Sequence, residues 1–104
     1  MPPKNFNQKV YELLKKIPKG KVTTYRILAE KLGTKAYRAV GNAMATNPYA
    51  PKVPCHRVVN SNGNVGNYSG KGGKKGKIRM LEKEGVKVKN GKIMDFEKVL
   101  FRFY

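Results

Sequence analysis

Cys55 and His56 are neighbours, and they are the only cysteine and the only histidine in the chain. A thiolate is a strong nucleophile, but a free thiol has a pKa of about 8.5 and is only a few per cent ionised at neutral pH. A nucleophilic cysteine therefore needs a nearby base, and histidine is the usual one. The pair predicts nucleophilic substitution, with Cys55 attacking and His56 taking the proton. A lone cysteine is more often a small buried apolar residue, and residue type alone favours that alternative.

The sequence around Cys55 favours the nucleophile. No acidic residue lies between Glu30 and Glu82, whereas lysine and arginine recur throughout that window, and a positive field favours thiolate over thiol. Pro54 stiffens the chain directly before Cys55 and so helps to hold its side chain in one place.

A base also needs a partner that orients it. Glu82 and Glu84 are the candidate carboxylates, although a solvated surface charge is the usual fate of a glutamate. If residues 55–59 form the buried extended stretch that their composition predicts, Cys55 and His56 point to opposite sides. Contact between them then requires a turn or a bridging water.

The composition limits the classes of protein that fit. The 104 residues include 23 Lys and Arg and 6 Asp and Glu, a formal net charge of +17, which indicates a polyanionic partner such as nucleic acid. With 39% hydrophobic residues, the chain should form one domain with a modest core and not a disordered tail. One cysteine excludes an internal disulfide and a multi-cysteine metal cage. No apolar run approaches a membrane span, and no apolar signal core follows Met1. We therefore expect a protein that is not secreted and that acts in the cytoplasm at the nucleoid, or in the nucleus.

Apolar periodicity predicts three helices in the first half of the chain. The first covers residues 6–17 with Asn5 as its N-cap, and Thr24 can cap a short second helix. The third covers about residues 35–46 and stops before Pro48. Two short helices joined by a glycine-containing turn predict a helix-turn-helix, and the charge favours DNA binding over a plain helical hairpin.

The third helix has little side-chain bulk. A slender helix can enter a narrow minor groove, but it can equally pack closely on a neighbouring helix, and the sequence leaves both open. Its small residues are Ala36, Ala39, Gly41, Ala43 and Ala45, and its long ones are Tyr37, Arg38, Asn42 and Met44.

The second half contains fewer regular elements. Residues 60–76 read as a long basic loop of the kind that is functional or mobile, followed by a helix that ends at residues 84–85. Residues 86–94 predict a β-hairpin around an Asn-Gly turn, and residues 99–104 are apolar enough to dock on the core. The expected fold is mainly α with a small β-hairpin.

Four groups of residues stand in a distinctive order and spacing: Arg38-Ala39-Val40-Gly41 through Asn47-Pro48, then Pro54-Cys55-His56-Arg57-Val58-Val59, then Val65-Gly66-Asn67-Tyr68-Ser69-Gly70, and then Leu81 with Glu84-Gly85. They resemble the motifs of the O6-alkylguanine-DNA alkyltransferases, also called methylated-DNA–protein-cysteine methyltransferases. The resemblance covers roughly residues 6–94. It implies one winged helix-turn-helix-like domain over residues 1–104, equivalent to the family's C-terminal catalytic and DNA-binding domain, without the family's N-terminal domain.

The resemblance implies a chemical role for each matched residue. Cys55 would accept the alkyl group and keep it, and His56 would act as base through a water. Glu84 would orient the histidine, in preference to Glu82, because it stands directly before the glycine. The hydroxyl of Tyr25 would assist protonation of the guanine leaving group.

The resemblance also implies the DNA contacts. Arg38 would enter the duplex where the base has left, and Asn47 would be the hinge between the recognition helix and the active-site segment. Val58 would offer its carbonyl to the base edge, while Tyr68 and Ser69 would form a pocket wall and an amide donor to the guanine oxygen. The other expected contacts are Gly66 in the pocket and Ala36, Tyr37, Ala39, Asn42 and Ala45 on the third helix. Residues 71–75 make the loop after Ser69 longer and more basic than the family pattern.

These assignments predict stoichiometric repair of O6-alkylguanine, mainly O6-methylguanine, in double-stranded DNA after the nucleotide is flipped out of the stack. A thioether is a poor leaving group, so we expect one turnover, no cofactor, no metal, no membrane and a monomer. The nearest alternative is an alkyltransferase-like protein, a class that replaces the cysteine and flags lesions for other machinery. A winged-helix regulator would need neither Cys-His nor so slender a helix, and a ribosomal protein fits only the charge.

Overall fold

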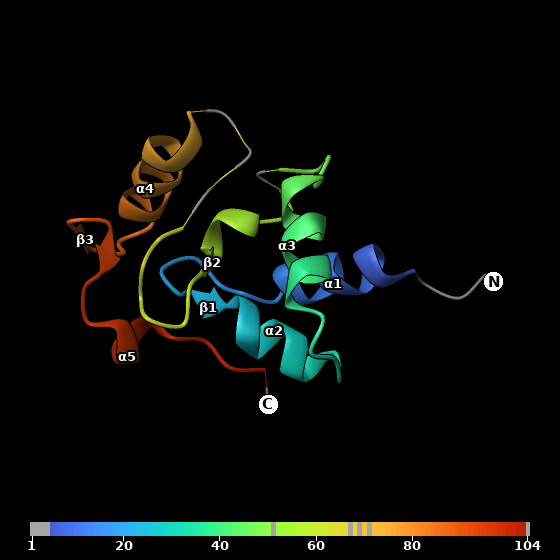
Figure 1. Ribbon diagram of the computed structural model, residues 1–104. Coiled ribbons are helices and arrows are strands. Elements are labelled where there is room, and N and C mark those ends of the chain that lie inside the picture. The colour runs from blue at the N-terminus through green and yellow to red at the C-terminus, as the bar shows by residue number, and fades with distance from the viewer. Residues whose placement is uncertain (1–4, 51, 67, 69, 71, 104) are drawn as a thin grey trace.

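The computed structural model describes residues 5–103 apart from residues 51, 67, 69 and 71. In Figure 1, the helices of the N-terminal half (blue to green) lie on one side of the molecule, and the C-terminal helices and hairpin (orange to red) lie on the other, with short strands between the two sides. The N-terminal elements are α1 (Phe6–Leu14), β1 (Thr23–Thr24), α2 (Tyr25–Lys31) and α3 (Tyr37–Ala45). The C-terminal elements are the 3-10 turn η1 (Cys55–Arg57), β2 (Val58–Val59), α4 (Gly73–Lys83), β3 (Val88–Lys89), β4 (Lys92–Ile93) and α5 (Phe96–Val99).

Side-chain caps start the first two helices, as the sequence predicts. Asn5 Oδ1 accepts from the Gln8 amide at 2.8 Å while Gln8 returns a bond to the Asn5 amide, which forms a capping box. Thr24 Oγ1 accepts from the Ile27 amide at 3.0 Å and so caps α2. The regular helix α1 ends at Leu14, three residues before the expected end, but Ile17 is still buried.

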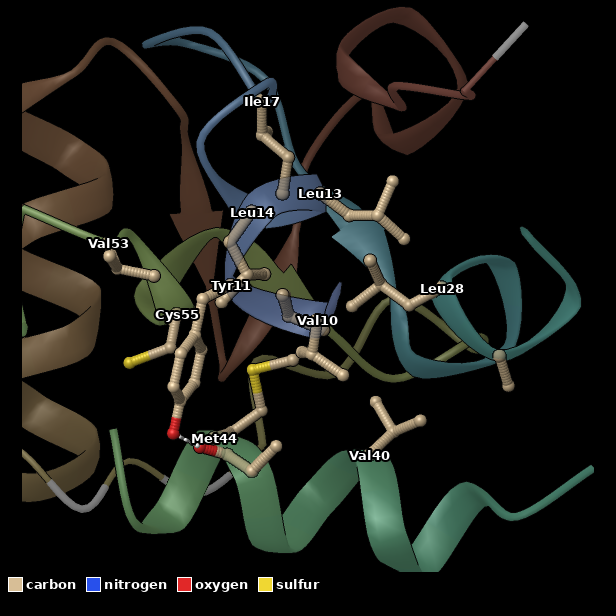
Figure 2. Packing of buried hydrophobic residues seen from close by; sticks show 13 residues of the cluster. Val10, Tyr11, Leu13, Leu14, Ile17, Leu28, Val40, Met44, Val53 and Cys55 are labelled. Atoms are coloured by element: carbon tan, nitrogen blue, oxygen red, sulfur yellow. Dashed lines mark hydrogen bonds between the residues drawn. The ribbon is translucent and has the colours of Figure 1, made fainter. Parts of the chain in front are cut away.

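The core consists of two clusters with a pair of parallel strands between them. The first joins α1, α2 and α3 with Cys55 and Val58, and Figure 2 shows Leu14 at its centre. The second joins Val22, Val59 and the residues that α4 and the hairpin bury. Strands β1 and β2 pair with Thr23 opposite Val58. Because neighbouring strand residues point to opposite sides, Val58 enters one cluster and Val59 the other.

The prediction of an extended stretch over residues 55–59 is wrong for its first three residues. Residues 55–57 form a 3-10 turn, in which the Arg57 amide donates to the Pro54 carbonyl at 3.0 Å, and only Val58 and Val59 are a strand. The turn is stabilised by distant groups that the Arg57 side chain binds, and a local pattern carries no information about them.

The predicted loop over residues 60–76 is also too long. Helix α4 begins at Gly73, so Lys74 and Lys75 are helical and not part of an extended basic loop. Three glycines among residues 72–76 hide this start, because glycine is a poor helix former. The end of α4, with Glu84 as C-cap and Gly85 at φ 94°, agrees with the prediction.

The β-hairpin and the docking of the C-terminal segment are confirmed. β3 and β4 are antiparallel and are joined by Asn90 and Gly91, both at positive φ, the conformation that an Asn-Gly turn favours. The C-terminal segment runs beside Val22, whose carbonyl accepts from the Phe101 amide, and the Phe101 ring packs against the first core cluster. No pattern in the sequence predicts the short helix α5 that precedes this segment.

The buried hydroxyl of Tyr11 links α1 to α3 by donating to the Ala43 carbonyl at 3.0 Å. We predict that Tyr11→Phe lowers the free energy of unfolding by about 1 kcal/mol, because the carbonyl loses a buried donor while the packing is kept. Tyr49→Phe is the matched control, since the Tyr49 ring is 58% exposed. Urea denaturation measures both, and equal stability of the two variants would contradict this role of the hydroxyl.

Candidate active site

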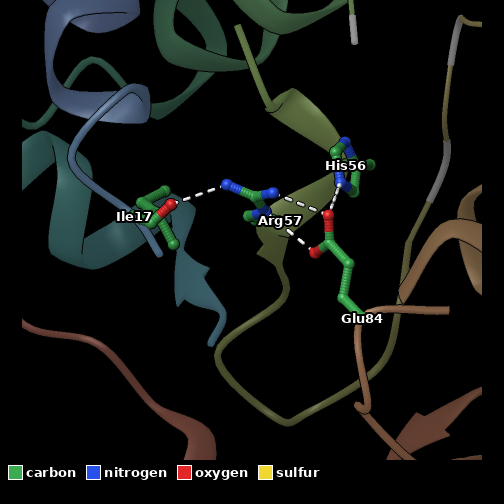
Figure 3. Close-up of polar contacts among 4 residues, drawn as sticks. All are labelled: Ile17, His56, Arg57 and Glu84. Carbon is green, nitrogen blue, oxygen red and sulfur yellow. Dashed lines mark hydrogen bonds and ion pairs between the residues drawn. The ribbon is translucent and has the colours of Figure 1, made fainter. Parts of the chain in front are cut away.

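Arg57 and Glu84 form a two-bonded ion pair that joins three parts of the chain (Figure 3). Arg57 Nε donates to Glu84 Oε1 at 2.9 Å and Nη2 donates to Oε2 at 2.6 Å, while Nη1 donates to the Ile17 carbonyl at 2.7 Å. Both charged side chains are largely buried, with 11% and 13% of their surface exposed. The pair therefore ties η1 to the end of α4 and to the chain after α1.

The same carboxylate fixes the orientation of His56. Glu84 Oε2 lies 3.1 Å from His56 Nε2. Burial raises the pKa of Glu84, but hydrogen bonds from Arg57 and His56 and the charges of both residues outweigh it and hold that pKa below its usual value. An ionised Glu84 only accepts hydrogen bonds, so Nε2 of His56 carries the proton.

His56 is left with one unprotonated ring nitrogen. Burial lowers the pKa of His56, and the nearby charges of Arg57 and Lys77 lower it further against the opposing effect of Glu84. With the proton on Nε2, Nδ1 has a free lone pair, and this buried atom has no hydrogen-bond partner among the described residues. No direct hydrogen bond joins His56 to Cys55. His56 is thus a neutral base, and a proton from Cys55 would have to reach it through a bridging group.

Cys55 lies in a hollow of about 820 Å³ between α3, the start of α2 and the segment after β2. The thiol residue is 4% exposed. Seven residues that the sequence assigned to the site line this hollow: Tyr25, Tyr37, Arg38, Ala45, Cys55, Gly66 and Tyr68. Gly41, Met44 and Asn60 line it as well. The hollow therefore brings the thiol residue together with residues of α3, with Tyr25 and with the segment after β2.

The hydroxyls of Tyr25 and Tyr68 lie close enough to Cys55 for a negative charge there to raise their pKa. Burial raises the pKa of Tyr25, and a negative charge on Cys55 raises it further. The pKa of Tyr68 is raised by the same two causes in the same order. Both hydroxyls hence keep their protons at neutral pH. Tyr25 is the first residue of α2, placed there by the Thr24 cap.

Helix α3 presents a slender exposed face to the hollow. Arg38, Asn42 and Ala45 are exposed and follow one another at helical spacing, and Tyr37 at the start of the helix is 46% exposed. Ala36 is the exposed N-cap, while Ala39 is only partly exposed. The side of α3 that faces the core buries Val40, Ala43 and Met44, and Met44 also lines the hollow. Of the two uses that the sequence left open for the small residues, close packing on neighbouring helices is confirmed, since α3 packs on α1 and α2. Helix α3 also keeps a slim outer face, and entry of that face into a minor groove stays a prediction.

Asn47 connects α3 to the segment that leads to Cys55. Its Nδ2 donates to the Val53 carbonyl at 2.9 Å, and its Oδ1 accepts from the Tyr49 amide at 2.9 Å. The side chain thus spans the turn between α3 and the residues before the thiol. Ser69, the expected amide donor, lies outside the described residues.

Lys77 belongs to the site, and sequence reasoning missed it. It is 1% exposed, and its Nζ donates to the carbonyls of Val58 at 2.7 Å and Val65 at 2.6 Å. Burial lowers its pKa from 10.5 to about 8; a charge on Cys55 opposes this shift and Lys74 adds to it. The sequence does contain one indication that Lys77 is buried: it lies one helical turn before Leu81, on the apolar face of α4. The Val58 carbonyl, expected to face a base edge, already accepts this bond.

Within the part of the chain that the structure describes, no group of three or more His, Cys, Asp or Glu side chains could hold a metal ion. Nor is any helix there long and apolar enough to cross a bilayer. The chemistry available at this site is that of a thiol, a neutral imidazole, two tyrosine hydroxyls and a buried ammonium group.

Residues 5–86 match the family described as 6-O-methylguanine DNA methyltransferase, DNA binding domain. The chain belongs to this family. A relative from Thermococcus sibiricus, named methylated-DNA–protein-cysteine methyltransferase, is 52% identical over 83 residues, which are 79% of this chain and 45% of the relative.

Two solved structures relate the fold to DNA. A Mycobacterium tuberculosis OGT crystallised in complex with DNA is 39% identical, with a TM-score of 0.72 over 80% of this chain and 51% of that one. Schizosaccharomyces pombe (S. pombe) Atl1, in complex with damaged DNA containing O6-carboxymethylguanine, is 32% identical, with a TM-score of 0.82 over 98% of this chain and 99% of that one. This family member therefore spans about half the length of its methyltransferase relatives and nearly all of the Atl1 chain.

The buried ammonium group of Lys77 predicts a pH dependence of stability. Between pH 8 and 10.5 the unfolded chain keeps a proton on Lys77 that the folded chain has released, so the free energy of unfolding rises with pH across this window. From pH 7 to 10.5, the free energy of unfolding of the wild type should rise by on the order of 3 kcal/mol relative to that of Lys77→Met. Chemical denaturation at several pH values measures the difference.

The matched control is Lys75→Met on the exposed side of α4. The difference in free energy of unfolding between Lys75→Met and the wild type should not change with pH. A constant difference between the wild type and Lys77→Met would contradict the lowered pKa of Lys77.

Proposed function

We propose that this chain is the catalytic domain of an O6-alkylguanine-DNA alkyltransferase and that it moves the alkyl group from O6-alkylguanine in duplex DNA to Cys55. The single observation that carries the proposal is the position of the thiol. Cys55 lies in a hollow beside the exposed face of α3, next to a histidine that a buried carboxylate orients and that burial keeps neutral. A core cysteine needs none of these neighbours.

The proposed reaction begins with proton removal. The Cys55 proton passes, through a bridging water, to Nδ1 of His56, which then carries protons on both ring nitrogens. Glu84 stabilises the resulting cation through Nε2, and Arg57 keeps Glu84 ionised and in place. Lys77 adds a positive charge near the thiolate.

Alkyl transfer follows as a displacement at carbon. A lone pair of the Cys55 thiolate forms the new carbon–sulfur bond while the bond between the alkyl carbon and O6 breaks, and its electrons move into the guanine. Tyr25, whose raised pKa keeps its hydroxyl protonated, donates that proton to the guanine anion, and the proton held on Nδ1 of His56 returns through the water to the Tyr25 phenolate. Part of the shift comes from the charge on Cys55 and disappears when the thioether forms, so Tyr25 becomes a better acid as the reaction proceeds. The thioether is stable, and each molecule reacts once.

The slender outer face of α3 supports a minor-groove approach. An alkylated O6 lies inside the base stack, and extruding the nucleotide costs a few kcal/mol. Arg38 is exposed on α3 at the rim of the hollow, where it can occupy the gap that the nucleotide leaves. Asn47, Tyr68 and Ser69 keep their proposed roles as hinge, pocket wall and amide donor, and Val58 as the carbonyl that faces the base.

Lesion binding without chemistry is the alternative that the whole-length likeness to S. pombe Atl1 favours. Such a protein needs the hollow and Arg38 but no nucleophile. The presence of Cys55 beside an oriented His56 favours transfer.

Incubation with a duplex that contains one O6-methylguanine should raise the intact mass of the protein by one methylene, located on Cys55 by peptide mapping. Cys55→Ala should bind the same duplex with unchanged affinity and gain no mass. Tight binding by the wild type with no change in mass would refute the transferase and support lesion binding alone.

Arg38→Ala should slow transfer from duplex DNA at least tenfold, because the vacated gap in the stack is no longer filled. Transfer from the free base O6-methylguanine should keep its rate, since no extrusion is needed. Single-turnover kinetics with both substrates measure the effect. Arg102→Ala, which removes an exposed arginine away from the hollow, is the control. Normal duplex kinetics for Arg38→Ala would mean that another residue supports extrusion.

A further inference from the structure

The positive charge of this chain is not on its recognition helix. The net charge is +17, yet α3 carries only one cation, Arg38. Among the residues that the structure describes, that arginine is the only charged one that lines the hollow around Cys55. The active face therefore accounts for little of the electrostatic attraction that the composition predicts.

A compact group of lysines lies elsewhere, around the hairpin turn. In the antiparallel register, Lys89 is directly opposite Lys92, and both side chains are exposed. Lys74, in the first turn of α4, reaches the turn between them, with its Nζ 3.4 Å from the position of a Cβ built on Gly91. We call Lys74, Lys89 and Lys92 the wing lysines.

This arrangement is unfavourable for the isolated chain. Like charges directly opposite one another destabilise a strand pair, and a cation in the first turn of a helix opposes the helix dipole. None of the wing lysines forms an ion pair within the described part of the chain. Helix α4 has no acidic residue in its first turn and no side-chain cap. An external anion at this point would relieve every one of these repulsions.

We propose that the wing lysines form a second DNA contact, which binds phosphates of the sugar-phosphate backbone independently of the lesion. The inference deepens the proposed function, because it rests on duplex DNA being the partner. A backbone is favoured over an acidic protein segment, since the family match is to a DNA-binding domain. Phosphate contacts of this kind add affinity and salt dependence without sequence information.

The second contact is separate from the site of extrusion. Figure 1 shows α4 and β3 at one end of the molecule and α3 toward the other. No residue of α4 or the hairpin lines the hollow around Cys55. Because the wing lysines stand outside the hollow, they meet either another part of the bound duplex or a second duplex. In both cases they hold the protein on undamaged DNA while α3 samples the minor groove.

The test is the salt dependence of binding to an undamaged duplex. Each phosphate contact contributes about 0.9 to the slope of log K against log salt concentration. The triple variant Lys74→Gln, Lys89→Gln, Lys92→Gln should make this slope less negative by about 2–3, measured by fluorescence anisotropy. Its thermal unfolding midpoint should be equal to or above that of the wild type, because repulsion has been removed.

The matched control removes the same charge from the groove between α1 and α2. Lys9, Lys16 and Lys31 line that groove, and replacing all three by Gln should change the slope by less than about 1. Equal changes in the two triple variants would overturn the proposal, because net charge alone would then explain binding. An unchanged slope in the wing variant would also overturn it, as would a lowered unfolding midpoint, which indicates a structural role.

Two further arms identify the anion. The first arm mixes two differently labelled duplexes with the protein and measures energy transfer between them. Energy transfer with the wild type that is lost with the wing variant assigns the contact to a second duplex. If no energy transfer is seen and the wing variant still changes the salt slope, the contact is to the same duplex. If poly-glutamate binds the wild type as tightly as DNA and the wing variant loses only that binding, the proposal fails in favour of an acidic protein partner.

Alkyl transfer from a saturating lesion duplex should be unchanged in the wing variant. Because the slope is measured without a lesion, the absence of transfer in the wild type would refute the proposed function and leave this test valid.

Discussion

The buried pair between Arg57 and Glu84 is the interaction on which the rest of the structure depends. It joins the residues after α1, the turn that carries Cys55 and the end of α4, which are far apart in sequence. Removing one partner of such a pair costs about 3–5 kcal/mol, because the other charge stays buried and unpaired. The pair also decides the chemistry, since the same carboxylate selects the protonated nitrogen of His56. Stability and reactivity of this domain therefore share one group of atoms.

Around the thiol, burial favours the neutral forms of Glu84 and Lys77, whereas neighbouring charges of opposite sign favour their ionised forms. Glu84 must stay ionised to orient His56, and burial alone would protonate it, so Arg57 compensates. Lys77 lies in the apolar interior at a cost, and its pKa near 8 reflects that cost. Its two bonds to the carbonyls of Val58 and Val65 fasten α4 to the strand that follows the thiol. A well-packed apolar residue would be more stable there, but it would supply neither the charge nor the bonds.

Charge and shape are divided between two surfaces. Helix α3 stays slender and nearly uncharged, which suits close approach to a groove, whereas the lysines concentrate on other elements, with Lys89 and Lys92 opposed across the hairpin. Attraction between lysines and phosphates acts within about 8–10 Å at physiological salt, and a duplex presents phosphates along its whole length, so the cations need not lie beside the thiol. A close-fitting helix does require small side chains where it meets its partner. This separation explains how a chain with a net charge of +17 can have an almost neutral active hollow.

The sequence by itself determined the elements whose signals are local. The caps at Asn5 and Thr24, the stop of α4 at Gly85 and the Asn-Gly hairpin depend on neighbouring residues and could be predicted, and the motif around Cys55 pointed to the family. Only the tertiary structure decided the 3-10 turn at Cys55 and the burial of Lys77, whereas the family resemblance had already favoured Glu84 over Glu82 as the partner of His56. The turn and the buried lysine depend on contacts across 12 to 40 positions of sequence, between groups whose free energy is set by burial. A local pattern records which side chains are available, and the packed interior determines which of them meet and in which protonation state.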